Sequence, residues 1–484
     1  MNKVLLLFKS RFFRIIFAVF FVIGGILAFQ KYQDLQNPTC KDCNLILISV
    51  DTLRPDHMGV YGYEKNTTPN IDKWAKGATV LTNMHTVVPA TFPSFTTLMT
   101  GKHVFDTQIY NNFGVRFDGK LLNGGEPIDS NTQTIADILS ANGYITAAFI
   151  TNQSLNTKLT NIGKGFKQYN HFIGDWNKNK YLEFFNKSLD WMQQNKNKKL
   201  FLWLHLMSPH SPYSPTNDFQ CKFNNKYCNV IKTEGLTSLE DERKKYQGCF
   251  GNIDKNTLEL YKTLYDGEIG FDDNIVGEIL NTIKDTGLDK KTVVILLSDH
   301  GEGFEHDYYF MHTDSLNEQH TRIPFIIKMP NLNGGMNNTL IDNTQFFATI
   351  LELLGISKGS NSSFIQVLRN HDSNSINNRP VYSVNTNLSK FSITLGDYKY
   401  IYSIQGYTCQ FNNKDEFLYN LKDDPNEEIN LEDTNIALKN IYKQMLMTHL
   451  EKYNLPTIPI NWYIEDTHSE EKEAIIQDIK SLGY

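Results

Sequence analysis

Two short apolar runs that each end in an acidic residue constrain the fold of this chain more than any other feature. Residues 44–50 form a β-rich run followed by Asp51, and residues 292–298 form a second run followed by Asp299 and His300. Runs of this length and composition are typical of fully buried strands in a parallel sheet. Ligands of open α/β sheets bind beyond the carboxyl ends of the strands. We therefore expect two carboxylates and an imidazole to meet there, where they would suit a divalent cation such as zinc, manganese or calcium.

Further strand-like runs alternate with helical patterns and predict an α/β fold. The strand-like runs cover residues 145–150, 200–207 and 323–328, and residues 261–283 carry isoleucines at helical spacing. Beyond an Asn- and Ser-rich stretch at 355–378, short strands near 380–383, 391–395 and 398–402 precede a helix at about 434–453. We therefore divide the chain into an N-terminal leader (1–30), a catalytic domain (31–380) and a smaller C-terminal subdomain (381–484).

Thr91 is the candidate nucleophile. Pro93 stands where a helix could begin and Gly101 where it could stop, which would place Thr91 at or just before the helix N-terminus. Backbone donors and the helix dipole favour an anionic group at that position. A threonine hydroxyl attacks only when a base or a metal activates it. Thr91 could instead be a simple helix cap, with both aspartates merely ending strands, but the joint appearance of these features favours a hydroxyl nucleophile beside a metal.

Several segments of the chain, taken in order, resemble the sulfatase family of the alkaline phosphatase superfamily. The resemblance spans roughly residues 43–435 and is carried by residues 48–62, 68–72, 100–102, 208–213, 265–269, 298–302, 322–327 and 418–431. It implies a three-layer α/β sandwich with a largely parallel central sheet and a smaller C-terminal α+β subdomain. It also implies one divalent metal, preferably zinc with manganese or calcium as alternatives, held by Asp51, Thr91, Asp299 and His300.

The nucleophile segment departs from the sulfatase pattern. Family sulfatases carry a cysteine or serine that is oxidised to formylglycine, followed by a proline and an arginine, whereas this chain has Thr91, Pro93 and Phe95 at those positions. Threonine cannot become formylglycine, and the local pattern resembles the nucleotide pyrophosphatase and phosphodiesterase branch, in which an unmodified threonine attacks phosphorus. We therefore expect a phosphoester hydrolase or phospho-group transferase. The alternatives are a sulfuric ester hydrolase and a non-catalytic, membrane-anchored sulfatase-like protein.

Other polar residues could complete the site. The resemblance places His210 and His312 near the substrate, as second-metal ligands, general acids or anion contacts. No carboxylate closely precedes His210, so one metal is expected. Lys102 could neutralise substrate oxygens or could be an ordinary surface lysine. Three further histidines are expected outside the site, namely His205 in a buried strand and His306 and His320 at the surface or rim.

The start of the chain predicts export. Basic residues up to Arg14 precede an apolar run at 15–29, and no small-residue cleavage site follows it. We expect an uncleaved signal anchor rather than a cleaved signal peptide, with a cytoplasmic N-terminus and a catalytic domain in the periplasm, at the cell surface or in a secretory lumen. Secretion would follow if the segment were cleaved. Six cysteines fit this location, with Cys40–Cys43 and Cys221–Cys228 as candidate disulfides.

Charge and composition limit the classes of molecule that the protein can bind. A net charge of -6 with 40% hydrophobic residues is ordinary for a globular protein, and no basic stripe indicates nucleic-acid binding. An anionic ester substrate must therefore be attracted locally, by the metal and the helix end. The charged loop at 217–251 is the expected insertion over the site and determinant of substrate choice. Asn-x-Ser/Thr sequons, among them Asn152, do not distinguish a bacterial envelope from a secretory pathway.

Overall fold

The computed structural model describes residues 38–112, 114–115, 121–122, 127–172, 177–248, 253–369, 379–404 and 414–453, which lie almost entirely in one compact unit, Cys40–Tyr484. The predicted N-terminal anchor, Cys249 and Cys409 lie outside these residues. No helix within the described part of the chain is long and apolar enough to cross a membrane.

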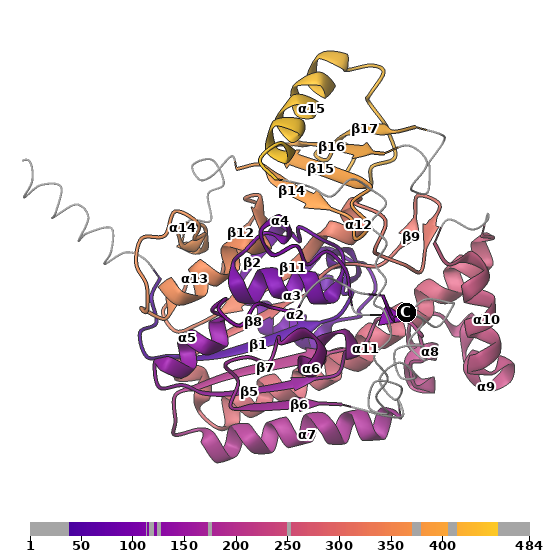
Figure 1. Ribbon diagram of the computed structural model, residues 1–484. Coiled ribbons are helices and arrows are strands. Elements are labelled where there is room, and N and C mark those ends of the chain that lie inside the picture. Colours follow the sequence, from indigo (N-terminus) through magenta and orange to yellow (C-terminus); the bar gives the residue numbers. More distant parts are fainter. Residues whose placement is uncertain are drawn as a thin grey trace, which may run out of the picture. The chain divides into compact units, whose positions relative to one another are not determined.

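A nine-stranded mixed sheet forms the centre of the fold (Figure 1). Its order is β12-β2-β11-β8-β1-β7-β5-β6, with β13 also pairing with β2. All neighbours are parallel except β11, which runs antiparallel to both β2 and β8. The strands are β1 (Asn44–Val50), β2 (Thr79–His85), β5 (Ile145–Ile150), β6 (Gln168–His171), β7 (Leu200–Leu206), β8 (Thr292–Leu297), β11 (Arg322–Lys328), β12 (Gly335–Asn337) and β13 (Ile341–Asp342).

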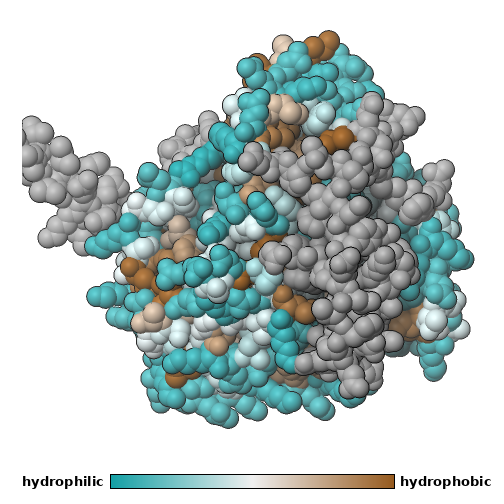
Figure 2. All heavy atoms as spheres, in the orientation of Figure 1, coloured by the Kyte–Doolittle hydropathy of each residue, from teal (hydrophilic) through white to brown (hydrophobic). Residues whose placement is uncertain are grey.

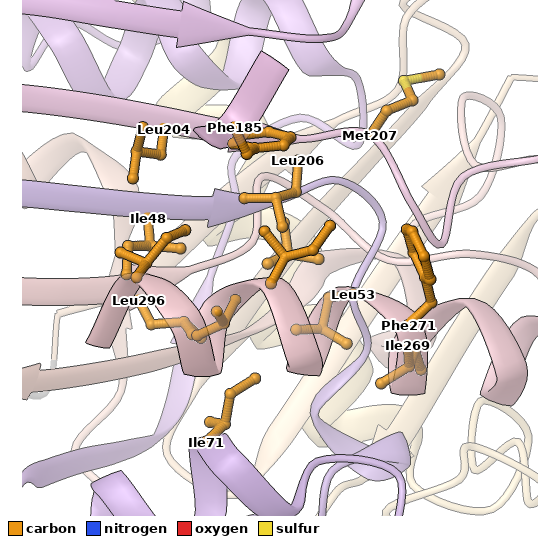
Figure 3. Close-up of a cluster of buried hydrophobic side chains, with 14 of the residues drawn as sticks. Ile48, Leu53, Ile71, Phe185, Leu204, Leu206, Met207, Ile269, Phe271 and Leu296 are labelled. Atoms are coloured by element: carbon orange, nitrogen blue, oxygen red, sulfur yellow. The ribbon is translucent and has the colours of Figure 1, made fainter. Parts of the chain in front are cut away.

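Helices cover both faces of this sheet, which explains why its central strands β1, β7 and β8 are largely apolar and buried along their whole length. Alternate residues of β1 enter different cores: Ile46 and Ile48 join one cluster, and Leu45 and Leu47 join the other. The first cluster contains side chains of α2 (Pro69–Ala75), α7 (Lys178–Asn195) and α11 (Lys255–Asp285). Figure 3 shows part of it, with Ile48 among its labelled residues. The second cluster contains side chains of α3 (Thr91–Thr100), α5 (Ile135–Ala141), α13 (Phe346–Leu353) and α14 (Ile365–Arg369).

The C-terminal subdomain is a four-stranded antiparallel sheet with one long helix. Its strands are β14 (Val381–Val384), β15 (Lys390–Leu395), β16 (Tyr398–Ser403) and β17 (Glu416–Asn420), and its helix is α15 (Ile436–Leu450). These elements share a hydrophobic cluster with Val87, Val88 and Ala90, the residues that lead into α3. The predicted α/β fold with a smaller C-terminal subdomain is confirmed.

The expected loop at 217–251 is helical where the structure describes it. It contains α8 (Asn217–Phe223), α9 (Val230–Glu234) and α10 (Leu236–Tyr246), and Figure 1 shows these helices grouped beside α11. Disulfides join Cys40 to Cys43 and Cys221 to Cys228, as the spacing indicated. The remaining short α-helices are α4 (Val104–Thr107), α6 (Thr157–Thr160) and α12 (Glu318–Thr321), and the remaining short strands are β3 (Gly114–Val115), β4 (Leu121–Leu122), β9 (Phe304–Glu305) and β10 (Tyr308–Tyr309).

Candidate active site

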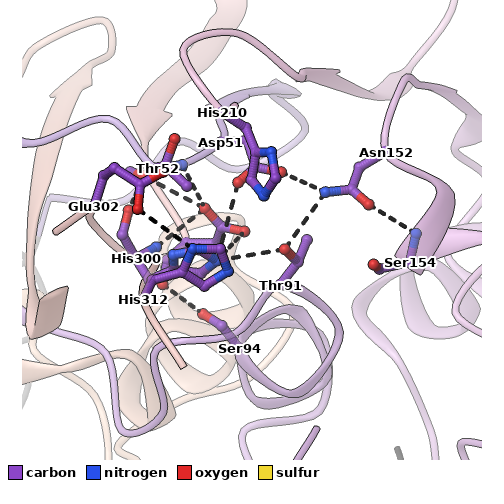
Figure 4. Close-up of polar contacts among 12 residues, drawn as sticks. Asp51, Thr52, Thr91, Ser94, Asn152, Ser154, His210, His300, Glu302 and His312 are labelled. Carbon is purple, nitrogen blue, oxygen red and sulfur yellow. Dashed lines mark hydrogen bonds and ion pairs between the residues drawn. The ribbon is translucent and has the colours of Figure 1, made fainter. Parts of the chain in front are cut away.

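Four adjacent parallel strands bring the candidate residues to one edge of the sheet. In the order β8-β1-β7-β5, Asp299 and His300 follow β8, Asp51 follows β1, His205 lies near the end of β7, and Asn152 follows β5. The strand ends meet there because all four strands run in the same direction. Figure 4 shows Asp51, Asn152 and His300 around Thr91, the first residue of α3.

Two carboxylates and an imidazole form a compact buried cluster. One ligand atom from each of Asp51, Asp299 and His300 lies within 4.8 Å of the others, and no other such group of three occurs among the described residues. His300 Nε2 lies 3.5 Å from Asp299 Oδ2 and 3.9 Å from Asp51 Oδ1. Burial and the nearby charge of Asp299 raise the pKa of Asp51 well above its usual value. The arrangement is electrostatically costly unless a proton or a cation compensates the two carboxylates.

The donor set fits a divalent metal. Asp51 Oδ1 and Asp299 Oδ2 are buried and have no hydrogen-bond partner. His300 Nδ1 lies 3.0 Å from the Gly301 carbonyl oxygen, a contact in which the ring must donate, so Nε2 keeps its lone pair and faces both carboxylates. Two carboxylate oxygens and an imidazole nitrogen therefore converge with their lone pairs available, and the nitrogen favours zinc or manganese over calcium.

The backbone beside Asp51 is strained in a way that supports this cluster. Thr52 has φ +54°, a left-handed conformation that is unfavourable for a β-branched residue. In this conformation the Thr52 backbone N–H donates to Asp299 Oδ1 at 3.3 Å, while the Tyr265 hydroxyl donates to the Thr52 carbonyl at 2.7 Å. Asp299 Oδ1 also accepts from the backbone N–H of His300 at 3.0 Å. One oxygen of Asp299 is thus fixed by backbone donors, which leaves Oδ2 directed into the cluster.

Thr91 lies against the cluster at the N-terminus of α3. Its Oγ1 is 3.3 Å from His300 Nε2, and the residue is fully buried. Ser94, one turn later, donates to the Asp299 carbonyl at 2.8 Å and so attaches the helix to the end of β8. The backbone N–H of Phe92 donates to Asn112 Oδ1 at 2.7 Å, and the buried Nδ2 of Asn112 has no hydrogen-bond partner. As the sequence predicted, a helix begins at Thr91, and it ends at Gly101, which has φ +69°.

His210 and His312 form the next layer of the site. The His312 ring stacks on His300 with centroids 4.2 Å apart, and the His210 ring lies 5.4 Å from that of His312. His312 Nδ1 is 3.7 Å from Glu302 Oε1. Burial alone would raise the pKa of Glu302, but the hydrogen bond and charge of His312, with the charge of His210 and the Gly303 backbone N–H, together lower this pKa to about 2. Burial, with His312 nearby, lowers the pKa of His210 to about 3, so His210 is neutral at physiological pH.

The other predicted positions lie as follows. Lys102 is exposed, and its ammonium donates to the Thr132 hydroxyl at 3.1 Å, so the structure does not bring it to Thr91. His205 is buried in β7, as expected, and lies 3.4 Å from Asp51 Oδ2. His306 is half-buried in the wall of a cavity of about 480 Å³. The surface placement of His320 is wrong, because its ring is buried and its Nε2 lies 3.2 Å from the Met311 carbonyl.

Three polar residues of the site were missed by sequence reasoning: Asn112, Asn152 and Glu302. Glu302 belongs to the segment 298–302, in which Asp299 and His300 were already assigned to the metal site. Asn152 is the second residue after the run 145–150, as His300 is after the run 292–298. This offset was a usable signal for Asn152. The sequence carries no comparable signal for Asn112, which reaches the site from the chain beyond α4.

Comparison with known proteins identifies the family. The profile of the Sulfatase family matches residues 43–356, well over half of the chain. The chain belongs to the sulfatase family. It is 23% identical to mouse arylsulfatase K over 437 residues, which cover 80% of this chain and 76% of that protein. It is 26% identical to an arylsulfatase of Clostridium perfringens over 374 residues, which cover 65% of this chain and 75% of that protein.

Solved structures share the fold. A protein determined in complex with its substrate D-glucosamine-2-N,6-O-disulfate superposes with a TM-score of 0.66 at 17% identity, covering 85% of this chain and 98% of that one. The phosphonate monoester hydrolase of Agrobacterium radiobacter superposes with a TM-score of 0.65 at 16% identity, covering 85% and 96%. The chain is therefore a sulfatase-family ester hydrolase. The names of its relatives favour the sulfuric ester alternative over the expected phosphoester hydrolase.

Proposed function

We propose that this member of the sulfatase family is a metal-dependent phosphoester hydrolase or phospho-group transferase with Thr91 as its nucleophile. The observation that carries the proposal is the buried Thr91 hydroxyl at the start of α3, which lies against His300, a member of the cluster with Asp51 and Asp299. A formylglycine sulfatase needs an oxidisable cysteine or serine at that position, whereas a threonine ester must be cleaved by a second nucleophile. Phosphoryl transfer commonly proceeds through such an ester.

The reaction would proceed in two balanced steps. Thr91 Oγ1 attacks phosphorus, the bond from phosphorus to the ester oxygen breaks, and the departing alcohol takes up the proton that Thr91 loses. Water, or an acceptor alcohol in a transferase, then attacks the phosphothreonine and restores the Thr91 hydroxyl. Asp51, Thr91, Asp299 and His300 would hold the metal, preferably zinc. When bound, the metal would lower the pKa of the Thr91 hydroxyl and stabilise charge on the reacting oxygens.

The neighbouring residues have distinct roles in this proposal. The His210 ring donates from Nδ1 to the Ser211 carbonyl at 2.6 Å, which leaves Nε2 as an acceptor facing the site. His210 therefore suits a hydrogen-bond contact to a substrate hydroxyl, because its low pKa makes it a weak base. His312, beside the charged Glu302, suits proton donation to the leaving oxygen. The buried amide of Asn112 can donate to a substrate oxygen near the helix end.

A sulfuric ester hydrolase is the second candidate, because the named relatives include arylsulfatases. The two candidates separate when the purified full-length protein is assayed with matched aryl phosphate, aryl phosphodiester and aryl sulfate in the presence of zinc, manganese or calcium. We expect the protein to hydrolyse a phosphate ester and Thr91→Ala to lower kcat by about 10³-fold or more. Thr91→Ser should retain a substantial part of the activity because it keeps the hydroxyl. Release from the sulfate alone, or full activity of Thr91→Ala, would overturn the proposed chemistry.

A further inference from the structure

Asn152 occupies an unusual position between the candidate metal site and the candidate nucleophile. It lies two residues beyond β5 and caps a short 3₁₀ helix, Gln153–Leu155. Its Oδ1 accepts from the Ser154 backbone N–H at 2.7 Å, and this bond fixes which end of the amide faces the site. The Nδ2 group is therefore directed toward Asp51 and Thr91, as Figure 4 shows, and the residue is fully buried.

The single Nδ2 group reaches both functional residues. It donates to Asp51 Oδ2 at 2.5 Å and to Thr91 Oγ1 at 3.4 Å. Because Oδ2 of Asp51 accepts this bond, Oδ1 is the oxygen left without a partner and available to the cluster. The two N–H bonds of one amide can serve these two acceptors at the same time.

His205 of β7 approaches the same carboxylate oxygen without forming a hydrogen bond to it. His205 Nε2 lies 3.4 Å from Asp51 Oδ2, and Ser49 Oγ lies 2.9 Å from His205 Nδ1. The Trp203 indole N–H in turn donates to Ser49 Oγ at 2.9 Å. Asp51 Oδ2 thus packs against the end of β7 and accepts a hydrogen bond from the residues that follow β5.

We propose that Asn152 is a positioning residue that holds Asp51 with one oxygen directed at the metal and restrains the Thr91 hydroxyl beside it. Groups that hydrogen-bond to ligating carboxylates orient the ligands and raise metal affinity. A hydrogen bond to Thr91 Oγ1 also stabilises the oxygen as it loses its proton. The Thr91 half of this inference rests on the proposed function, whereas the Asp51 half depends only on the metal cluster.

The burial of Asn152 has a consequence for its sequon. A glycan attached to Nδ2 would displace both hydrogen bonds and would have no exit from a fully buried position. The sequon Asn152-Gln153-Ser154 is therefore not used as a glycan acceptor in the folded protein. This allows Ser154→Ala to serve as a matched control, since it removes the sequon but keeps the backbone N–H that orients Asn152.

The test combines metal binding with kinetics. Zinc and manganese are titrated into the metal-stripped full-length protein and its Asn152→Ala and Ser154→Ala variants, and the melting temperature of each metal-free protein is recorded. We expect the Kd of Asn152→Ala for the metal to rise about 10- to 100-fold, whereas loss of the cap should lower the metal-free melting temperature without unfolding the protein. With the ester that the protein cleaves, kcat should fall and KM should change little. Ser154→Ala should match the unchanged protein in all of these measurements.

Asn152→Ser provides a second variant in case the alanine protein does not fold. Serine can still cap the 3₁₀ helix but is too short to reach Asp51, so the same loss of metal affinity is expected. A Kd within twofold of the unchanged protein in a folded Asn152 variant would overturn the inference. Failure of the proposed function is a separate result, because the metal titration gives its answer whether or not a phosphate ester is cleaved.

Discussion

A buried charge network between the two sheets gives the sharpest stability prediction. Lys399 of β16 donates to Glu318 Oε1 at 2.9 Å and lies 3.4 Å from Glu427 Oε1. His85 of β2 lies 3.0 Å from the same Glu318 oxygen. The side chains of Lys399 and Glu427 are each 1% exposed, so their charges have almost no access to water. The network joins the C-terminal sheet to the catalytic sheet through buried side chains that compensate one another's charges.

Replacing Lys399 by methionine should be strongly destabilising. Methionine fills a similar volume but leaves Glu318 and Glu427 buried together without the ammonium group. Breaking a buried ion pair in this way costs about 3–5 kcal/mol of the free energy of unfolding. Burial already raises the pKa of Glu427, with Glu318 adding to the effect. The cost should therefore be smaller at acidic pH, where Glu427 can bind a proton.

The double variant Lys399→Met, Glu427→Gln tests this reasoning. It removes the unpaired charge together with the lysine, so it should recover about 2 kcal/mol or more of the loss. The measurement is equilibrium unfolding in urea, with the slope m compared among the variants. Lys414→Met is the matched control: Lys414 pairs with Glu432 and Asp433 but is 38% exposed, and its loss should cost less than about 1 kcal/mol. A cost below about 1 kcal/mol for Lys399→Met, or no recovery in the double variant, would refute the account.

Three further predictions concern the core, pH dependence and the metal. Phe95 is buried, with its ring 4.9 Å from that of Trp203, so Phe95→Arg should destabilise the fold by more than about 4 kcal/mol. It should not create sulfatase activity. Urea unfolding measures the loss of stability, and an aryl sulfate assay measures the activity. Burial lowers the pKa of His449 in the folded protein to about 4. The unfolded chain therefore binds a proton at His449 more readily, and the folded protein should lose stability as the pH falls from about 6.5 to 4. His449→Phe, which can keep the stack on Tyr382, should flatten this part of the stability–pH curve. Removal of the metal by a chelator should lower the melting temperature of the protein. Metal at 100 times its Kd stabilises the folded state by about 2.7 kcal/mol, and calorimetry should show that Asp299→Asn loses most of this stabilisation.

The fold could be predicted wherever a buried element has a simple pattern of apolar residues in the sequence. The runs that became β1, β5 and β8 are largely apolar and are buried at every position except Ile145, because helices cover both faces of the sheet. The segment 217–251 gave no such pattern. Within α10 only Leu239 and Arg243 are buried, so this helix has no apolar stripe to reveal it. The burial of His320 could not be predicted from the sequence either, because it depends on the contact of its ring with the Met311 carbonyl, nine residues earlier in the chain.

The candidate site could be predicted to the extent that its residues follow strands. Asp51 and Asp299 follow long apolar runs, and a parallel sheet brings such strand ends together whatever the loops do. Pairwise contacts were not predictable, because they depend on strand order. Asn152 meets Asp51 only because β7 places β5 two strands from β1, and the loop after β5 turns back across it.

The charges around Thr91 indicate how the site must recognise an anion. Phe95, where formylglycine sulfatases carry arginine, is a core residue, and no lysine or arginine within the described residues forms an ion pair with Asp51 or Asp299. The nearest donors, such as the Asn152 amide, are neutral. Two buried carboxylates would repel an anionic ester unless a cation offset them. Metal removal should therefore weaken substrate binding as well as turnover, whereas a site built around an arginine would still bind its substrate. Direct titration of a substrate analogue into the metal-stripped protein distinguishes these two forms of recognition.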